Sequence, residues 1–270
     1  MNEDRMQMAE VLEGEHRLPT LQLVTNLVDP GVSSVLDVGC GTGALIHLLD
    51  QKIPRASIIG IDRSQYLLRV LKERQSDAKI SLIQGEVPSF PFIESSFDLI
   101  IAVQSLHEIC GVMGDHALET TIQCLQVLLK EGGSLIVLDH ENPGYDLIRI
   151  RLPPHLFPIL EAFKMKFRPR EIVFNKIGHH EIEVSLRDFY DFVTKIWALD
   201  TPLEHEEMNE THTAFTREEF VGFVERVGLN VDYLGSATPI DNHLIRYGIK
   251  MHTPKNLPER HFILRAKKPP

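Results

Sequence analysis

The segment from Leu36 to Gly43 constrains the fold more than any other stretch of this chain. It is an apolar run that ends in glycines at positions 39, 41 and 43 and leads into a helical pattern beginning near Ala44. Glycine is needed where the backbone turns sharply and approaches a ligand without a Cβ atom in the way. The following helix offers free N–H groups and its positive dipole end to a negatively charged group. The segment therefore predicts a strand, a tight ligand-binding turn and a helix.

The same order of a short β-branched run and a longer helical pattern recurs along the first half of the chain. The predicted strands are Ser33–Val38, Ser57–Ile61, Ile80–Gln84, Phe97–Gln104 and Ser134–Asp139. The predicted helices between them are Ala44–Gln51, Ser64–Gln75 and Asp115–Lys130. Two later strands are predicted near Val231–Gly235 and His261–Ala266. This alternation predicts an α/β fold, a doubly wound, mostly parallel seven-stranded sheet with helices on both faces.

The alternation breaks after Asp139, where residues 143–215 carry six prolines and strongly polarised charge. Apolar residues stay frequent there, so we expect an inserted lid folded over the edge of the sheet. Regular structure resumes at Thr216, which forms a capping box with Glu219 at the start of a helix. The predicted division is an N-terminal helical cap (1–29), a ligand-binding core (30–142), a lid (143–215) and the completion of the core sheet (216–270).

Composition excludes several classes of protein. The chain has 28 Lys and Arg against 38 Asp and Glu, a formal charge of −10, so nucleic acid is not an expected partner. No apolar run approaches the roughly 18 residues that span a bilayer, so no membrane association is expected. The acidic N-terminal residues do not resemble a secretory signal. Three cysteines form neither a disulfide framework nor a metal motif, which indicates a reducing, cytoplasmic location.

The glycine turn alone leaves two cofactor classes open. Gly39, Gly41 and Ala44 also fit the GxGxxA pattern of nicotinamide and flavin enzymes, so an oxidoreductase is one alternative. Asp62 ends the second predicted strand, where an acid can bind a ribose diol. An N-cap of the following helix is the structural alternative for Asp62.

Later segments favour one of these classes. An acid, Glu86, follows the third predicted strand, the run from Pro91 to Asp98 leads into the fourth, and a Gly132–Gly133 turn leads into the fifth. With the glycine turn, these motifs resemble the class I S-adenosylmethionine-dependent methyltransferases, specifically those that act on small molecules. The resemblance covers residues 30–140 well and 216–266 loosely. It implies a Rossmann-like sheet, S-adenosylmethionine as cofactor, and methyl transfer by in-line displacement. A protein that binds this cofactor without catalysis is a further alternative.

The resemblance also implies a role for each matching residue. Gly39, Cys40 and Gly41 would line the methionine moiety, and Asp37 would bind its ammonium group. Asp62 would hold the ribose hydroxyls. The remaining expected contacts are Arg63 or Ser64 beside the adenine, Glu86 and Val87 at its edge, and Gln104 beside the methionine tail. Where this family usually has Asp followed by Ala, this chain has Glu86 and Val87, which affects the expected adenine geometry.

Two histidines are candidate catalytic residues because each follows a predicted strand on the ligand-binding side of the sheet. His107 follows the fourth strand and His140 follows the fifth, and we expect both to face the acceptor as candidate general bases. A solvated or helix-terminal histidine is the alternative for each.

No metal site is predicted from the other histidines. His179–Glu181, and His205–Glu207 with His212, match no HExxH or Cys/His spacing, and surface charge clusters explain them better. The basic stretch Lys164–Arg170 is expected to be a solvated face of the lid or to attract an anionic acceptor. The expected partner is a small-molecule acceptor, for which an anionic group is one option.

Overall fold

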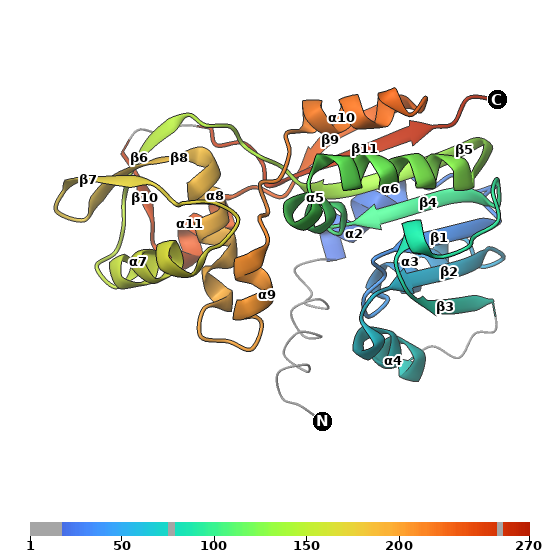
Figure 1. The fold of residues 1–270 in the computed structure, drawn as a ribbon, viewed down its shortest axis with the longest axis horizontal. Helices are drawn as coiled ribbons and strands as arrows, with labels where there is room; N and C mark the ends of the chain where they lie inside the picture. Colours follow the sequence, from blue (N-terminus) through green and yellow to red (C-terminus); the bar gives the residue numbers. More distant parts are fainter. Residues whose placement is uncertain (1–17, 75–78, 253–255) are drawn as a thin grey trace.

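The computed structural model describes residues 18–74, 79–252 and 256–270, which form two lobes (Figure 1). The larger lobe is built on a seven-stranded sheet with strand order β3-β2-β1-β4-β5-β11-β9. Strands β1 to β5 pair in parallel, and β11 pairs antiparallel with both β5 and β9. The core strands are β1 (Ser34–Val38), β2 (Ser57–Asp62), β3 (Ile80–Gln84), β4 (Phe97–Val103), β5 (Leu129–His140), β9 (Asn230–Ala237) and β11 (His261–Lys267). The predicted α/β class and the doubly wound sheet are confirmed.

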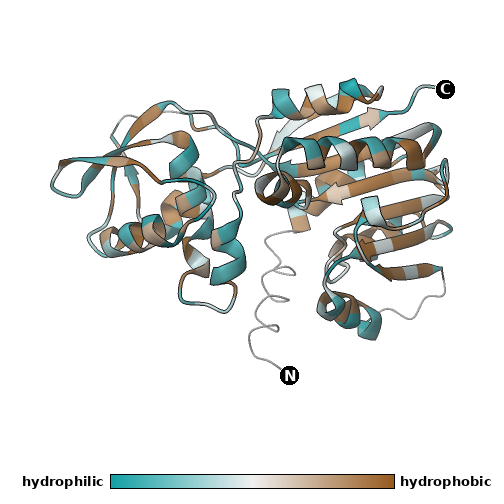
Figure 2. Ribbon diagram, in the orientation of Figure 1, coloured by the Kyte–Doolittle hydropathy of each residue, from teal (hydrophilic) through white to brown (hydrophobic). Residues whose placement is uncertain are grey.

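Alternate residues of the core strands enter two separate apolar clusters, one on each face of the sheet. On β1, Leu36 joins one cluster and Val35 the other; on β4, Ile100 and Leu99 divide in the same way. Side chains of a strand point alternately to opposite faces, so a strand that is apolar at every position must be covered on both. Figure 2 shows this concentration of apolar residues on the core strands. The covering helices are α2 (Leu18–Asn26), α3 (Ala44–Lys52), α4 (Gln65–Arg74), α5 (Leu106–Met113), α6 (Asp115–Leu128) and α10 (Arg217–Arg226).

The N-terminal cap is described only from residue 18, and the rest of it lies outside the described residues. Helix α2 packs against α3 and β5, and Leu21 and Val24 are buried in the apolar cluster on that face. The described part of the cap therefore belongs to the core.

Two local predictions from the sequence can be followed in detail. Thr216 Oγ1 accepts a hydrogen bond from the Glu219 backbone N–H, and the Thr216 backbone N–H donates to Glu219 Oε2, so the predicted capping box begins α10. The predicted fifth strand was too short, because β5 already begins at Leu129 and continues through Gly132, whose φ is +73°. Glycine accepts this left-handed conformation without steric cost, so the strand continues where a helix end and turn were expected.

The smaller lobe has its own four-stranded sheet, in the order β10-β6-β8-β7, in which every neighbouring pair is antiparallel. This sheet was not predicted from the sequence, although alternate residues of β8, Ile182 and Val184, are buried as in a half-buried strand. The elements are β6 (Leu147–Arg151), β7 (Phe174–Gly178), β8 (Glu181–Ser185), β10 (Lys250–Met251), α7 (Leu156–Lys166), α8 (Leu186–Lys195), α9 (Glu204–Asn209) and α11 (Asp241–Tyr247).

The boundaries predicted for the lid and the C-terminal part need a correction. Ile240 and Ile249 are buried in the apolar core of the smaller lobe, and β10 pairs with β6. Residues 240–251 therefore fold with residues 143–215 and do not complete the core sheet, because their apolar side chains fill the lid core. We call these two segments together the lid.

No helix within the described ranges is long and apolar enough to cross a membrane.

Candidate active site

A cavity of about 1120 Å³ lies at the carboxyl ends of the core strands and extends to α9 of the lid. Open α/β sheets bind ligands at this edge, because the loops there leave a crevice between helices on opposite faces. Each residue predicted to contact the cofactor lines this cavity. These residues are Asp37, Gly39, Cys40, Gly41, Asp62, Arg63, Ser64, Glu86, Val87 and Gln104.

The glycine turn is held against the second strand by backbone hydrogen bonds. The N–H groups of Gly39 and Cys40 donate to the Ile61 carbonyl at 2.9 and 3.2 Å, and the Gly41 N–H donates to Asp62 Oδ2 at 2.8 Å. Gly39 and Gly43 have φ values of +71° and +84°, which disfavour any residue with a Cβ atom. The turn is therefore a pre-formed wall of the cavity.

Two of these glycines also make room for neighbouring side chains. A Cβ atom on Gly39 would lie 2.7 Å from the Ser105 Cβ atom, and one on Gly43 would overlap the Leu71 side chain. Gly39 thus lets the loop after β4 approach the turn, and Gly43 lets α4 pack against it.

Asp37 is a buried acid of the cavity wall with one unpaired oxygen. Its side chain is 2% exposed, and its Oδ2 atom has no hydrogen-bond partner among the described residues. Burial, with the nearby charge of Asp62, raises the pKa of Asp37 to about 7. A cationic ligand group at this oxygen would remove the cost of a buried carboxylate without a partner.

Asp62 lies between the glycine turn and the start of α4. Its Oδ2 atom accepts from the Gly41 N–H, and its Oδ1 atom accepts from the Ser64 N–H at 2.7 Å, just before α4. The N-cap of α4 is Ser64, whose Oγ atom accepts from the Leu67 N–H, so the N-cap alternative for Asp62 was wrong and its ribose contact stays a prediction. Each carboxylate oxygen keeps a further lone pair for a ligand hydroxyl.

The opposite wall combines an ion pair with a residue in an unusual backbone conformation. Arg63 Nη2 donates to Glu108 Oε2 at 2.9 Å and so links the loop after β2 to α5. Gln104 has a φ of +51°, and its Nε2 atom lies 2.7 Å from Nε2 of His261. Non-glycine residues in this region cost energy and are concentrated at functional sites.

Glu86 and Val87, which were predicted to lie at the edge of the adenine, differ from each other in exposure. Glu86 is exposed and precedes the short 3-10 turn Val87–Ser89, whereas Val87 is buried. An exposed carboxylate at this position can still accept from an exocyclic amine.

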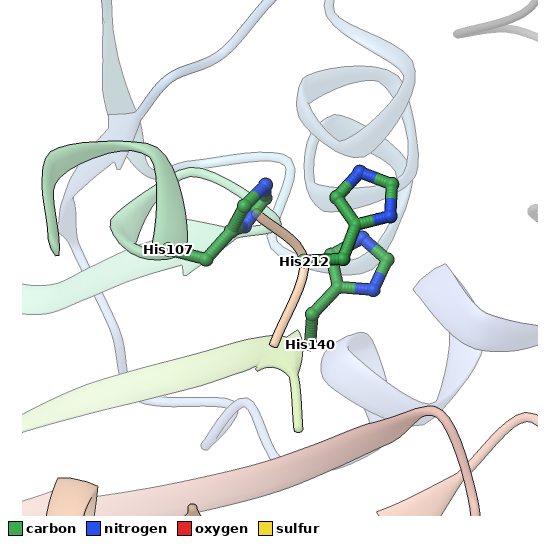
Figure 3. Close-up of side chains that lie close together, drawn as sticks. All are labelled: His107, His140 and His212. Carbon is green, nitrogen blue, oxygen red and sulfur yellow. The ribbon is translucent and has the colours of Figure 1, made fainter. Parts of the chain in front are cut away.

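The two predicted catalytic histidines do not face the cavity, contrary to expectation. His107 and His140 are 3% and 5% exposed and pack against each other with ring centroids 4.7 Å apart (Figure 3). His107 Nδ1 lies 2.6 Å from Asp139 Oδ1, and this carboxylate raises the pKa of His107 to about 9 against the effect of burial. Burial lowers the pKa of His140 well below its usual value. Two acids, Glu108 and Glu210, line the cavity instead.

A third histidine, His212, joins this cluster from the lid. Its ring stacks on that of His140, with centroids 4.0 Å apart and planes 4° from parallel (Figure 3). His212, Glu207 and Glu210 are enclosed beside the buried Lys195, which binds both glutamates at 2.8 and 3.2 Å. The interpretation as a surface charge cluster was therefore wrong for Glu207 and His212, whereas His205 and Glu206 are exposed. No local spacing could reveal the cluster, because its members come from separate segments.

The basic stretch of the lid is mostly engaged within the lid. Arg170 binds Asp188 at 2.9 Å and Asp191 at 2.7 Å, and its side chain is 18% exposed. Lys166 pairs with Glu204 at 2.7 Å. A solvated basic face or a site that attracts an anionic acceptor was expected here, but Arg170 is half-buried and paired with two acids, whereas Arg168 is exposed.

Comparisons with known proteins agree with this geometry. A family model described as a methyltransferase domain matches residues 35–133. Malonyl-[acyl-carrier protein] O-methyltransferase from Priestia megaterium is 35% identical over 115 residues, 43% of this chain and 39% of that protein. Trans-aconitate 2-methyltransferase from Acidovorax sp. is 28% identical over 149 residues, 51% of each chain. The chain thus spans about two-fifths to half the length of these relatives.

The fold also matches a solved structure over nearly its whole length. An S-adenosylmethionine-dependent methyltransferase from Mesorhizobium loti aligns with a TM-score of 0.58 at 16% identity, over 95% of this chain and 100% of that one. The Rossmann-like fold expected from the motifs is confirmed.

Proposed function

We propose that this chain, whose residues 35–133 belong to the methyltransferase domain family, transfers the methyl group of S-adenosylmethionine to a small molecule. The proposal rests on one observation: all ten residues predicted to contact the cofactor line the same cavity. The oxidoreductase alternative has no support from the relatives, which are methyltransferases.

The residues present fit this cofactor. The unpartnered Oδ2 atom of Asp37 suits an ammonium group, the pre-formed turn at Gly39 and Gly41 suits a backbone-lined methionine tail, and Asp62 keeps acceptor capacity for a ribose diol. When bound, the cofactor supplies an electrophilic methyl group on a sulfonium. The remaining task of the chain is to align an acceptor with that methyl group and to exclude water.

The acceptor end of the cavity lies between α5 and α9. Apolar side chains of Ile109, Val112 and Leu203 line it together with the carboxylates of Glu206 and Glu210. Acidic lining repels an anionic acceptor, and most of the basic lid stretch is paired elsewhere. An uncharged or cationic small molecule with an apolar part therefore suits this end better than an anion.

The roles of His107 and His140 as bases stay predictions. Neither lines the cavity, so a proton would have to pass through Glu108 or Glu210, which do.

The cytoplasmic location also stays a prediction from the sequence; the three cysteines are free thiols.

Titration calorimetry with S-adenosylmethionine and with NAD⁺ tests the cofactor. We expect saturable binding of the first only; binding of NAD⁺ alone would refute the proposal. Incubation with fractionated metabolites, followed by mass spectrometry for S-adenosylhomocysteine, then tests transfer. Cofactor binding with no such product from any fraction would favour the non-catalytic alternative.

A further inference from the structure

The histidine cluster lies where the core meets the lid, and its three rings come from three different elements. His107 is on α5 and His140 ends β5, both in the core, whereas His212 lies in the lid segment that follows α9 (Figure 3). One ring nitrogen of each histidine lies within 4.8 Å of one ring nitrogen of the other two. Three buried imidazoles this close together are unusual, because burial favours apolar or fully paired side chains.

In the rings of His107 and His212, Nδ1 is the nitrogen that makes a hydrogen bond, and Nε2 makes none. His107 Nδ1 is held by the Asp139 carboxylate at 2.6 Å. His212 Nδ1 lies 3.0 Å from Thr194 Oγ1, and that hydroxyl donates its own proton to the Tyr190 carbonyl at 2.7 Å. The hydroxyl must therefore accept from His212 Nδ1–H, which leaves a lone pair on Nε2. In metal sites, a partner on the second ring nitrogen fixes the tautomer and orients the ring in this way.

The third ring has no hydrogen bond at all within the described part of the chain. His140 is 5% exposed and neither of its ring nitrogens has a hydrogen-bond partner there; its neighbours are the rings of His107, His212 and His261. Both ring nitrogens of His140 therefore keep their hydrogen-bonding or ligating capacity. A ligand bound at the ring nitrogen would supply the missing interaction.

Carboxylates complete the surroundings. A carboxylate oxygen of Glu210 lies within 4.8 Å of a ring nitrogen of His107, and a carboxylate oxygen of Glu210 also lies within 4.8 Å of a ring nitrogen of His212. Glu207 Oε2 lies 3.7 Å from His212 Nε2. With Asp139, they give the site three acidic groups, which Lys195 and Arg260 offset in part. The set of imidazole and carboxylate donors in a negative field favours a divalent cation.

We propose that His107, His140 and His212, with Glu210 as the fourth ligand, bind a first-row divalent transition metal such as Zn²⁺. Three imidazoles and one carboxylate suit zinc and its neighbours, whereas Mg²⁺ and Ca²⁺ take oxygen ligands. The metal would link two residues of the core to two of the lid. It would also border the acceptor end of the cavity, which Glu210 lines.

Binding requires a small rearrangement of the rings. Zinc–nitrogen bonds of about 2.0–2.1 Å bring ligand nitrogens to roughly 3.3 Å from one another. The ring nitrogens of the three histidines now lie within 4.8 Å of one another, so they must move closer. The parallel stack of His140 on His212 cannot direct both rings at one ion, so one ring must turn.

Metal binding can be measured on the untagged full chain without any methyl-transfer assay. The protein is stripped with a chelator and titrated with Zn²⁺ by calorimetry, and with Co²⁺ by visible absorption. We expect one ion per chain, and a Co²⁺ spectrum of tetrahedral ligation. His140→Ala and His212→Ala should each weaken Zn²⁺ binding by at least 100-fold, and Thr194→Val by about 10- to 100-fold.

His116→Ala is the matched control, because His116 is exposed on α6 and should leave the affinity unchanged. Zn²⁺ should also raise the thermal transition of the wild-type chain and not that of His212→Ala, which separates metal binding from a folding defect. The absence of saturable binding, or equal binding by the wild type and both histidine variants, would overturn the proposal. These results do not depend on the proposed function, because no cofactor is present.

Discussion

Asp37 shows how one residue can be costly to the free protein and useful to the bound one. An acid within an apolar strand loses hydration, and the unpartnered Oδ2 atom keeps that cost until a cation arrives. The sequence showed the acid and its place before the glycines. It did not show the raised pKa, because that depends on Asp62 from another strand.

Affinity for S-adenosylmethionine should weaken as the pH falls below 7, because Asp37 then becomes protonated. The pKa of Asp37 is about 7 in the free protein, so the carboxylate that would bind the ammonium is increasingly protonated as the pH falls. We expect the dissociation constant to rise up to about tenfold between pH 7 and pH 6. Calorimetry across that range checks this. Asp37→Asn should bind weakly with little pH dependence, and an equally steep profile in Asp37→Asn would contradict the assignment.

Asp62→Ala should weaken cofactor binding by about 1–3 kcal/mol, because charge-assisted hydrogen bonds to the ribose would be lost. The variant also frees the Gly41 N–H from its bond and loosens the turn. Asp62→Asn can still accept the Gly41 bond and separates the two effects. Unchanged calorimetric affinity in both variants would remove Asp62 from the ribose site.

His140→Ala should slow turnover and leave cofactor affinity within about twofold, since His140 does not line the cavity. Steady-state kinetics, once an acceptor is known, and calorimetry measure the two quantities separately. Equal turnover would show that the cluster takes no part in the reaction.

At the scale of elements, the core could be predicted and the lid could not. Buried parallel strands are apolar throughout, so β1 to β4 were recognisable within a residue or two of their observed ends. The lid strands are short and pair antiparallel across long separations, such as β10 with β6. Prolines between them obscured the alternation at Ile182 and Val184.

The lid is held by a buried ionic network centred on Arg170 and Asp191. Asp191 is fully buried and accepts hydrogen bonds from Arg170, from the Thr211 and Thr213 hydroxyls, and from the His212 backbone N–H. The network therefore fixes the loop that carries His212.

Arg170→Ala should destabilise the protein by about 3–5 kcal/mol, because it leaves Asp191 buried without its ionic partner. Arg168→Ala, an exposed neighbour, should change the free energy of unfolding by no more than about 0.5 kcal/mol. Urea unfolding of both variants measures the difference. Similar midpoints for the two would show that the network contributes little.

At the scale of the molecule, the gathering of the predicted cofactor residues could be predicted and the cluster between the lobes could not. The ten residues predicted to contact the cofactor line one cavity, because their motifs lie next to strand ends that one sheet edge gathers together. His212 and Glu210 reach the core only through the folding of the lid, so no linear pattern places them beside His107.

The assignment of residues 240–251 to the lid has a direct test. Ile249 is 6% exposed within the lid core, so Ile249→Ala should cost about 2–5 kcal/mol. It should also raise hydrogen exchange in α7 and α8 more than in β1 and β4. Ile245→Ala, at a position 78% exposed, is the control and should leave exchange unchanged. Faster exchange confined to β9 and β11 would place the segment with the core instead.

The two-part construction of the lid also bears on how this chain could be re-engineered. A graft that exchanges only residues 143–215 for the equivalent insert of another protein would leave β10 and α11 facing a foreign surface, with Ile240 and Ile249 mismatched. The lid of this architecture should therefore be transplanted as two matched segments, with α10, β9 and the rest of the core left intact between them.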